Sequence, residues 1–81
     1  MLHPDLAALL QRRLDVIADH DFRDRDPEAH LTNLREASQA ITLWHSKHRG
    51  SLDARLEHFL RGCSYQKALI YLESDGAWRG H

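Results

Sequence analysis

Asp26-Pro27-Glu28 is the stretch that decides the fold of this chain, because it lies between two long segments of helical periodicity. The Asp26 carboxylate can accept hydrogen bonds from the first amides of a helix, and proline is favoured at the first helical position. The stretch therefore predicts the start of a long central helix, preceded by a polar connection from an earlier one. Two long helices joined in this way favour an antiparallel hairpin.

Both long helices show apolar residues at spacings of three and four, as one helical face requires. The first is predicted from about Pro4-Asp5 to Ala18–His20, and the second from Pro27 to about Lys47–Arg49, where Gly50 can end it. The face of the first helix consists of Leu2, Leu6, Leu9, Leu10, Leu14 and Ile17, and that of the second of Leu31, Leu34, Ser38, Ile41, His45 and His48.

Two shorter helices are predicted after Gly50. Ser51 can cap one over residues 52–61, and Ser64 can cap another over residues 65–73, with Gly62 between them. Ser74-Asp75-Gly76 is predicted to form a turn, within a poorly structured tail over about residues 74–81. The expected fold is therefore all-α, a single domain over residues 1–81 in which two short C-terminal helices close a hairpin of two long ones.

The helical stripes predict one contiguous core from all the helices. Its expected members are Leu6, Leu10, Leu14, Ile17, Leu31, Leu34, Ile41, Leu56, Phe59, Leu60, Leu69 and Leu72.

More apolar and aromatic residues are present than one hairpin face needs. Ala40 and Leu43 lie on the side of the central helix that faces away from the first helix. In a two-helix hairpin Leu43 would be in contact with water, so we expect a later helix or a second subunit to cover it. Exposed aromatic residues that gather in a patch are typical of interfaces. The predicted interface residues are Ala40, Leu43, Trp44, Tyr65, Tyr71 and Trp78.

Seven histidines are the unusual feature of the composition. His45 and His48 are three residues apart and would project from neighbouring points of one helical face. Such a pair can hold a transition metal if a third ligand arrives from elsewhere, for which His58, His30 and Glu57 are candidates. The chain has no HExxH motif and no Glu three residues before a histidine. The competing interpretation is that both histidines continue the buried stripe.

The charge balance disfavours a nucleic-acid partner. The chain carries 11 basic and 12 acidic residues, which alternate along the sequence, whereas nucleic-acid binding needs a basic excess or stripe. The single cysteine, Cys63, excludes an intramolecular disulfide and is expected to be a small buried side chain rather than a nucleophile. No segment resembles a secretion signal or a membrane span, so we expect a cytoplasmic protein without membrane contact.

No catalytic or phosphate-binding motif is present in the sequence, which favours a non-enzymatic role without a cofactor. The expected function is that of a small helical module for protein–protein interaction or self-association, with a symmetric homodimer as the expected assembly. The alternative is a histidine-based metal-binding or hydrolytic protein that uses His45 and His48.

Overall fold

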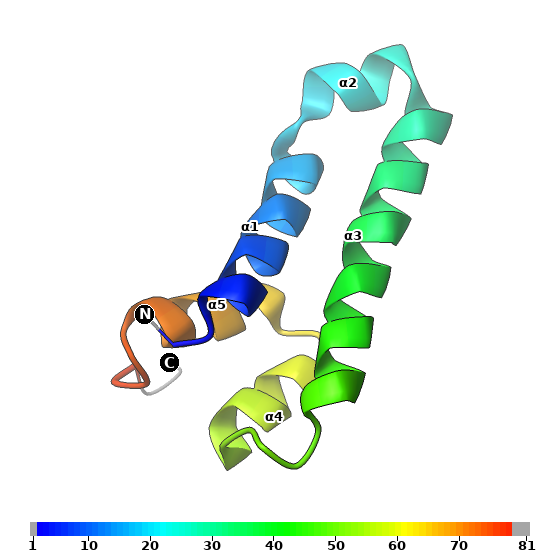
Figure 1. Cartoon of the computed structure of the whole chain (residues 1–81). Helices are drawn as coiled ribbons and strands as arrows, with labels where there is room; N and C mark the ends of the chain where they lie inside the picture. The colour runs from blue at the N-terminus through cyan, green and yellow to red at the C-terminus, as the bar shows by residue number, and fades with distance from the viewer. Residues whose placement is uncertain (1, 79–81) are drawn as a thin grey trace.

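The computed structural model describes residues 2–78 and confirms the all-α fold (Figure 1). The helices α1 (Pro4–Ala18) and α3 (Pro27–His48) form the antiparallel hairpin, and α2 (His20–Arg25) joins them at one end. The helices α4 (Ala54–Arg61) and α5 (Tyr65–Glu73) close the other end, where α5 packs on α1 and α4 packs on α5. None of the helices within residues 2–78 is long and apolar enough to cross a membrane.

The connection between the long helices is itself a short helix, α2, rather than an irregular loop. The Asp19 carboxylate caps it by accepting a hydrogen bond from the backbone N–H of Phe22 at 3.2 Å. The Phe22 ring is half-buried and lies 6.3 Å from the His30 ring, so it covers the end of the hairpin.

The signals that start and end α3 act as predicted. Asp26 Oδ1 accepts a hydrogen bond from the Ala29 N–H at 3.1 Å, and Gly50 follows the helix with a φ of +91°, which is costly for other residues. The cap of α4 is different from the prediction. Asp53, not Ser51, accepts the Leu56 N–H at 2.8 Å, because the Ser51 hydroxyl donates to the His48 carbonyl at the end of α3.

The Asp26 cap gives a prediction for stability. Asp26→Ala should lower the free energy of unfolding by about 0.5–2 kcal/mol, because an amide in the first turn of α3 loses its acceptor. Asp24→Ala is the control, since Asp24 is exposed and only approaches Arg23 at 3.9 Å. Urea denaturation of both variants measures the difference. Equal losses would mean that general charge, rather than the cap, stabilises this end of the hairpin.

The core lies at the closed end of the hairpin and not along its whole length. The predicted core residues of α4 and α5 are all buried, as are Leu6, Leu10 and Ile41. Ala7, Ala37, Trp44, Ala68 and Tyr71 are also buried.

Two predicted core residues are exposed, and this part of the prediction is wrong. Ile17 is 40% exposed and Leu31 is 53% exposed, while Leu14 and Leu34 are half-buried. The reason is the position of α5, which packs on α1 near the closed end of the hairpin (Figure 1). Of the two C-terminal helices, neither α4 nor α5 lies beside the half of the hairpin nearer to α2, as Figure 1 shows.

Residues 74–76 form a turn, as predicted, and a hydrogen bond connects this turn to Trp78. The Ser74 hydroxyl donates to the Tyr71 carbonyl and accepts from the Trp78 N–H, both at 3.0 Å. Gly76 has a φ of +83°, and a Cβ there would meet the Tyr71 hydroxyl at 3.3 Å. Glycine is therefore required for the turn to lie against Tyr71. The rest of the predicted tail, residues 79–81, lies outside the described residues.

Candidate functional site

Trp44, one of the predicted interface residues, is buried at the closed end of the hairpin, where it makes contacts within the chain. Its indole Nε1–H donates to Asp5 Oδ2 at 2.7 Å, and its ring stacks on the His48 ring at a centroid distance of 4.0 Å. His48 Nδ1 donates to the Trp44 carbonyl at 2.8 Å, and the His3 ring meets the indole edge-on at 5.3 Å. These contacts join the first turn of α1 to the last turn of α3.

The Asp5–Trp44 bond makes stability depend on pH. The indole N–H holds the pKa of the Asp5 carboxyl below its ordinary value of 3.8. The carboxylate therefore contributes stability that is present above pH 3.8 and is lost as the pH falls through the lower pKa of the folded state.

Asp5→Asn should remove this dependence. We expect the variant to be less stable than the wild type at pH 7, because the neutral amide is a weaker acceptor for the Trp44 N–H. The gap between the two proteins should narrow as the pH falls below 3.8. Thermal unfolding at a series of pH values between about 2.5 and 7 measures the gap. A gap that stays constant over that range would show that the Asp5 charge does not contribute.

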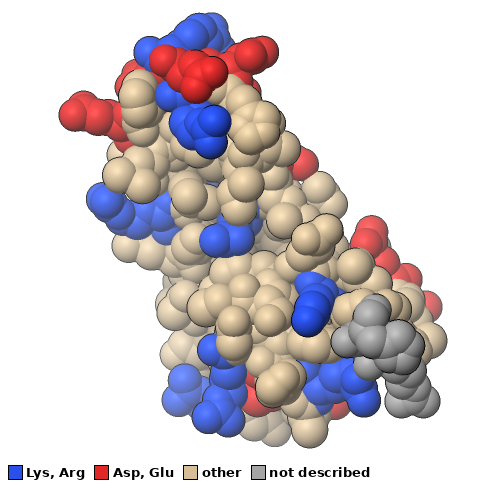
Figure 2. Space-filling model, turned by 180° about the vertical axis from the view of Figure 1, so that it is seen from behind, with Lys and Arg blue, Asp and Glu red and all other residues tan. Residues whose placement is uncertain are grey.

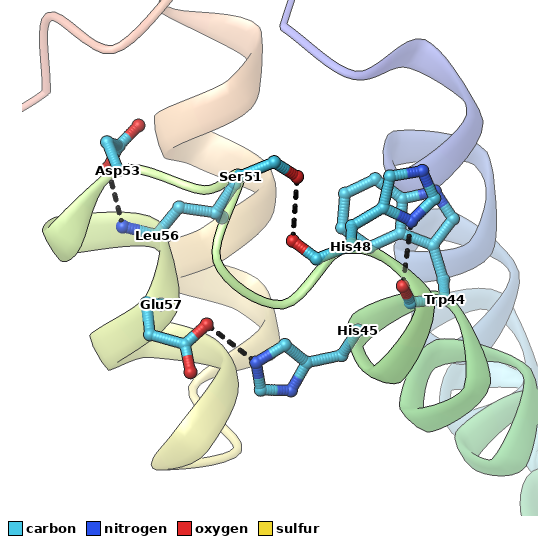
Figure 3. Close-up of polar contacts among 7 residues, drawn as sticks. All are labelled: Trp44, His45, His48, Ser51, Asp53, Leu56 and Glu57. Carbon is cyan, nitrogen blue, oxygen red and sulfur yellow. Dashed lines mark hydrogen bonds and ion pairs between the residues drawn. The ribbon is translucent and has the colours of Figure 1, made fainter.

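His45, His48 and His58 are not brought together as metal ligands. His45 Nε2 donates to Glu57 Oε2 at 2.7 Å and so links α3 to α4, while His48 is occupied against Trp44 (Figure 3). His58 is exposed on α4 and lies beside the Phe59 ring. In the part of the chain that the structure describes, no three His, Cys, Asp or Glu residues are placed to hold a metal ion. The half-buried positions of His45 and His48 fit their interpretation as the end of the buried stripe of α3.

His30 has a structural role that the sequence interpretation missed. It is buried between the arms of the hairpin, and its Nε2 donates to the Val16 carbonyl in the last turn of α1 at 2.7 Å. The carbonyls of a final helical turn lack partners within the helix, so this bond satisfies one of them. The signal in the sequence is the stripe His30, Ala37, Ile41, Trp44 and His48, whose spacings of seven, four, three and four also follow one helical face.

The other predicted interface residues are spread over different surfaces. Tyr71 is buried, with its ring 5.9 Å from the Phe59 ring. Trp78 is half-buried, and its ring also lies 5.9 Å from the Phe59 ring. Ala40 is half-buried, while Leu43 is 57% exposed on the outer side of α3. The six predicted residues therefore do not form one patch.

Tyr65 lies on a different surface, at the point where α5 begins beside the hairpin. The Arg13 guanidinium lies 4.7 Å from the centroid of its ring, and Arg13 Nε donates to Ser38 Oγ at 3.1 Å. Arg13 therefore connects α1, α3 and α5 on one side of the hairpin. Burial and the neighbouring Cys63 thiol raise the pKa of the Tyr65 hydroxyl above its ordinary value of 10.0. This hydroxyl donates to Cys63 Sγ at 3.6 Å.

Cys63 is exposed, which corrects the prediction that it is buried. It has a φ of +56° in the turn between α4 and α5, and this turn directs its thiol toward Tyr65. No hydrogen bond joins it to His58 in the described structure, so the pairing that a cysteine nucleophile would need is not formed.

The Arg13–Ser38 contact shows which side of each arm faces the same direction. On α1, Ile17 lies one helical turn after Arg13 in the sequence. On α3, Leu34 lies one helical turn before Ser38. Because the arms are antiparallel, both positions lie toward α2, and Leu31 follows Leu34 by a further turn. We call this surface the open side; it comprises Arg13, Leu14 and Ile17 of α1, Leu31, Leu34 and Arg35 of α3, and Tyr65 and Lys67 of α5.

The open side has an apolar floor and a basic rim. A shallow depression of this surface is lined by Arg13, Leu14 and Ile17 together with residues 63–67 of the turn and of α5. Figure 2, the view from behind, shows a mostly uncharged middle region in which the few charged groups are Lys or Arg, while groups of both signs lie at the upper and lower ends. An apolar surface with a polar rim is typical of a protein-binding site.

Comparisons with protein-family models, curated proteins and solved structures found no match for this chain.

Proposed function

We propose that this protein is a small helical interaction module that binds another protein through the open side of its α1–α3 hairpin. The observation that carries the proposal is the exposure of Ile17 and Leu31 on this side. Both belong to apolar stripes that elsewhere in the same helices fold into the core, so their exposure leaves apolar surface in contact with water.

The arrangement of the core gives further support. The core of this small domain is concentrated at the closed end, and α5 leaves Ile17 and Leu31, the part of the open side nearer to α2, exposed. A small domain buries a limited share of its surface, and covering further apolar residues with a partner would stabilise the folded chain by mass action. The polar contacts at Trp44 and His45 are already satisfied within the chain and serve the fold rather than a ligand.

Site-specific photo-cross-linking in cells that produce the protein tests this function. A photoreactive phenylalanine analogue replaces Leu31 in one variant and Ala8 in another. Ala8 is the control because it is exposed on the opposite side of α1 from Ile17. We expect a discrete cross-linked protein product from position 31 and none from position 8. Products of equal strength from both positions, or none from position 31, would contradict the proposal.

A second candidate is self-association through the outer side of α3, favoured by the 57% exposure of Leu43. Leu43 borders a shallow depression with Arg35, Ser38, Gln39, Thr42 and Ser46, which adjoins the open side at Arg35. Light scattering at micromolar concentration distinguishes the two candidates. A dimer that Leu43→Glu dissociates would favour this surface. A monomer, or a dimer unaffected by that substitution, would argue against it.

A further inference from the structure

The open side has room for one additional helix. In Figure 1, α5 crosses behind α1 near the closed end of the hairpin, and the arms continue beyond it toward α2. Leu10 is fully buried, and Ile17 is 40% exposed. At 1.5 Å per residue the two positions are about 10 Å apart along α1, which matches the 8–10 Å spacing of packed helices. A helix laid beside α5 would therefore cover Ile17 and reach Leu31 on the other arm.

The charged side chains that line the two depressions on this side have one sign. Arg13 and Lys67 line the depression next to α5, and Arg35 lines the neighbouring depression on α3. No acidic side chain is among the residues that line either depression. Arg35 and Lys67 form no ion pair with any residue from 2 to 78, whereas Arg12, on the other flank of α1, approaches Glu36 at 3.9 Å. The rim of the open side is thus basic and unneutralised within the described chain.

We propose that the occupant of the open side is an amphipathic helix of another protein that carries Asp or Glu beside its apolar stripe. The inference rests on the proposed function and names the class of partner. The apolar stripe of such a helix packs on Ile17 and Leu31, and its carboxylates pair with Arg35 and Lys67. Ile70 is exposed on α5, one turn from Lys67, and extends the apolar contact. This is the helix-in-groove mode of recognition, with charge complementarity that selects the partner.

A second copy of the chain does not supply this helix. The helices α1, α3, α4 and α5 carry acidic residues, but the main apolar stripe of each helix already packs in the core of its own chain and is not available to a second copy. The exposed Leu43 of α3 has neighbours of both signs, Glu36 and Lys47. The short helix α2 has alternating acidic and basic residues and buries no side chain fully. An acidic helix from a different protein fits the basic rim better than any of these.

The experiment uses a pair of designed peptides and the full-length protein. Each peptide has about 18 residues, enough for about five helical turns, with leucines at spacings of three and four. One carries Glu at the positions beside the leucines, and the other carries Lys there. Fluorescence anisotropy measures binding. We expect the Glu peptide to bind at least about tenfold more tightly than the Lys peptide at low salt, with the difference reduced at about 0.5 M salt by screening.

Charge reversal on the protein locates the effect. Arg35→Glu combined with Lys67→Glu should remove or invert the preference for the Glu peptide. Lys47→Glu combined with Arg49→Glu is the matched control, because it changes the net charge equally at exposed positions outside both depressions. Circular dichroism confirms that both double variants are folded. Loss of preference in the control pair as well would assign the effect to net charge and overturn the inference.

Three other results would overturn the inference in different ways. If both peptides bind equally and Leu31→Glu weakens both, the open side is a docking surface and only the acidic character of the partner is wrong. If neither peptide binds and the cross-link from position 31 joins two copies of the chain, the occupant is a second copy. If no cross-link forms at position 31 and neither peptide binds, the proposed function fails together with the inference.

Discussion

Leu10→Ala is expected to lower the free energy of unfolding by about 2–5 kcal/mol, because Leu10 is fully buried in the core cluster. The substitution removes buried apolar atoms and leaves a cavity that the surrounding helices can fill only in part. A native domain of this size is typically stable by about 0.05–0.15 kcal/mol per residue, so one such change removes a large share of the total. Urea denaturation followed by circular dichroism measures the loss.

Ile17→Ala is the matched control, since it removes a side chain from the same helix at an exposed position. We expect a loss below about 1 kcal/mol, because most of the Ile17 surface is already in contact with water. Similar losses at both positions would show that Ile17 is covered in solution, either by a second copy or by an extension of the core. That result would remove the basis for the open side.

The boundaries of the helices were predictable because their signals are local. Asp26 needs only the Ala29 amide three residues away, and Gly50 ends α3 through its own backbone conformation. The sequence did not predict that Asp53, rather than Ser51, caps α4. This choice depends on the hydrogen bond that the Ser51 hydroxyl donates to the His48 carbonyl. Short-range rules thus predict where elements begin and end, to within a few residues.

The burial of Ile17 and Leu31 was mispredicted because it depends on a long-range contact. Periodicity shows that both residues share a face with core leucines, but only the crossing position of α5 decides how far along the hairpin that face is covered. In α3 two overlapping stripes compete, and the one that faces α1 contains His30 and Trp44 instead of Leu31. The candidate site lies where local pattern and tertiary packing disagree.

Trp44→Ala is expected to destabilise the protein by about 3–5 kcal/mol, the second large effect of a single substitution. The indole is buried against the core, stacks on His48 and donates to Asp5, so its removal breaks contacts that join α1 to α3. Urea denaturation with circular dichroism detection measures the loss. A loss below about 1 kcal/mol would mean that the indole is exposed in solution and would restore Trp44 as an interface residue.

Trp44→Phe separates the packing of the ring from its hydrogen bond. Phenylalanine keeps an aromatic ring against His48 but has no N–H for Asp5, so we expect a smaller loss than for alanine. The Asp5 carboxyl then loses the partner that holds its pKa below 3.8, and the destabilisation of the wild type in acid should become less steep in this variant. If the acid profile of Trp44→Phe instead follows that of the wild type, the Asp5–Trp44 bond does not contribute to stability, and the joint between α1 and α3 depends on packing alone.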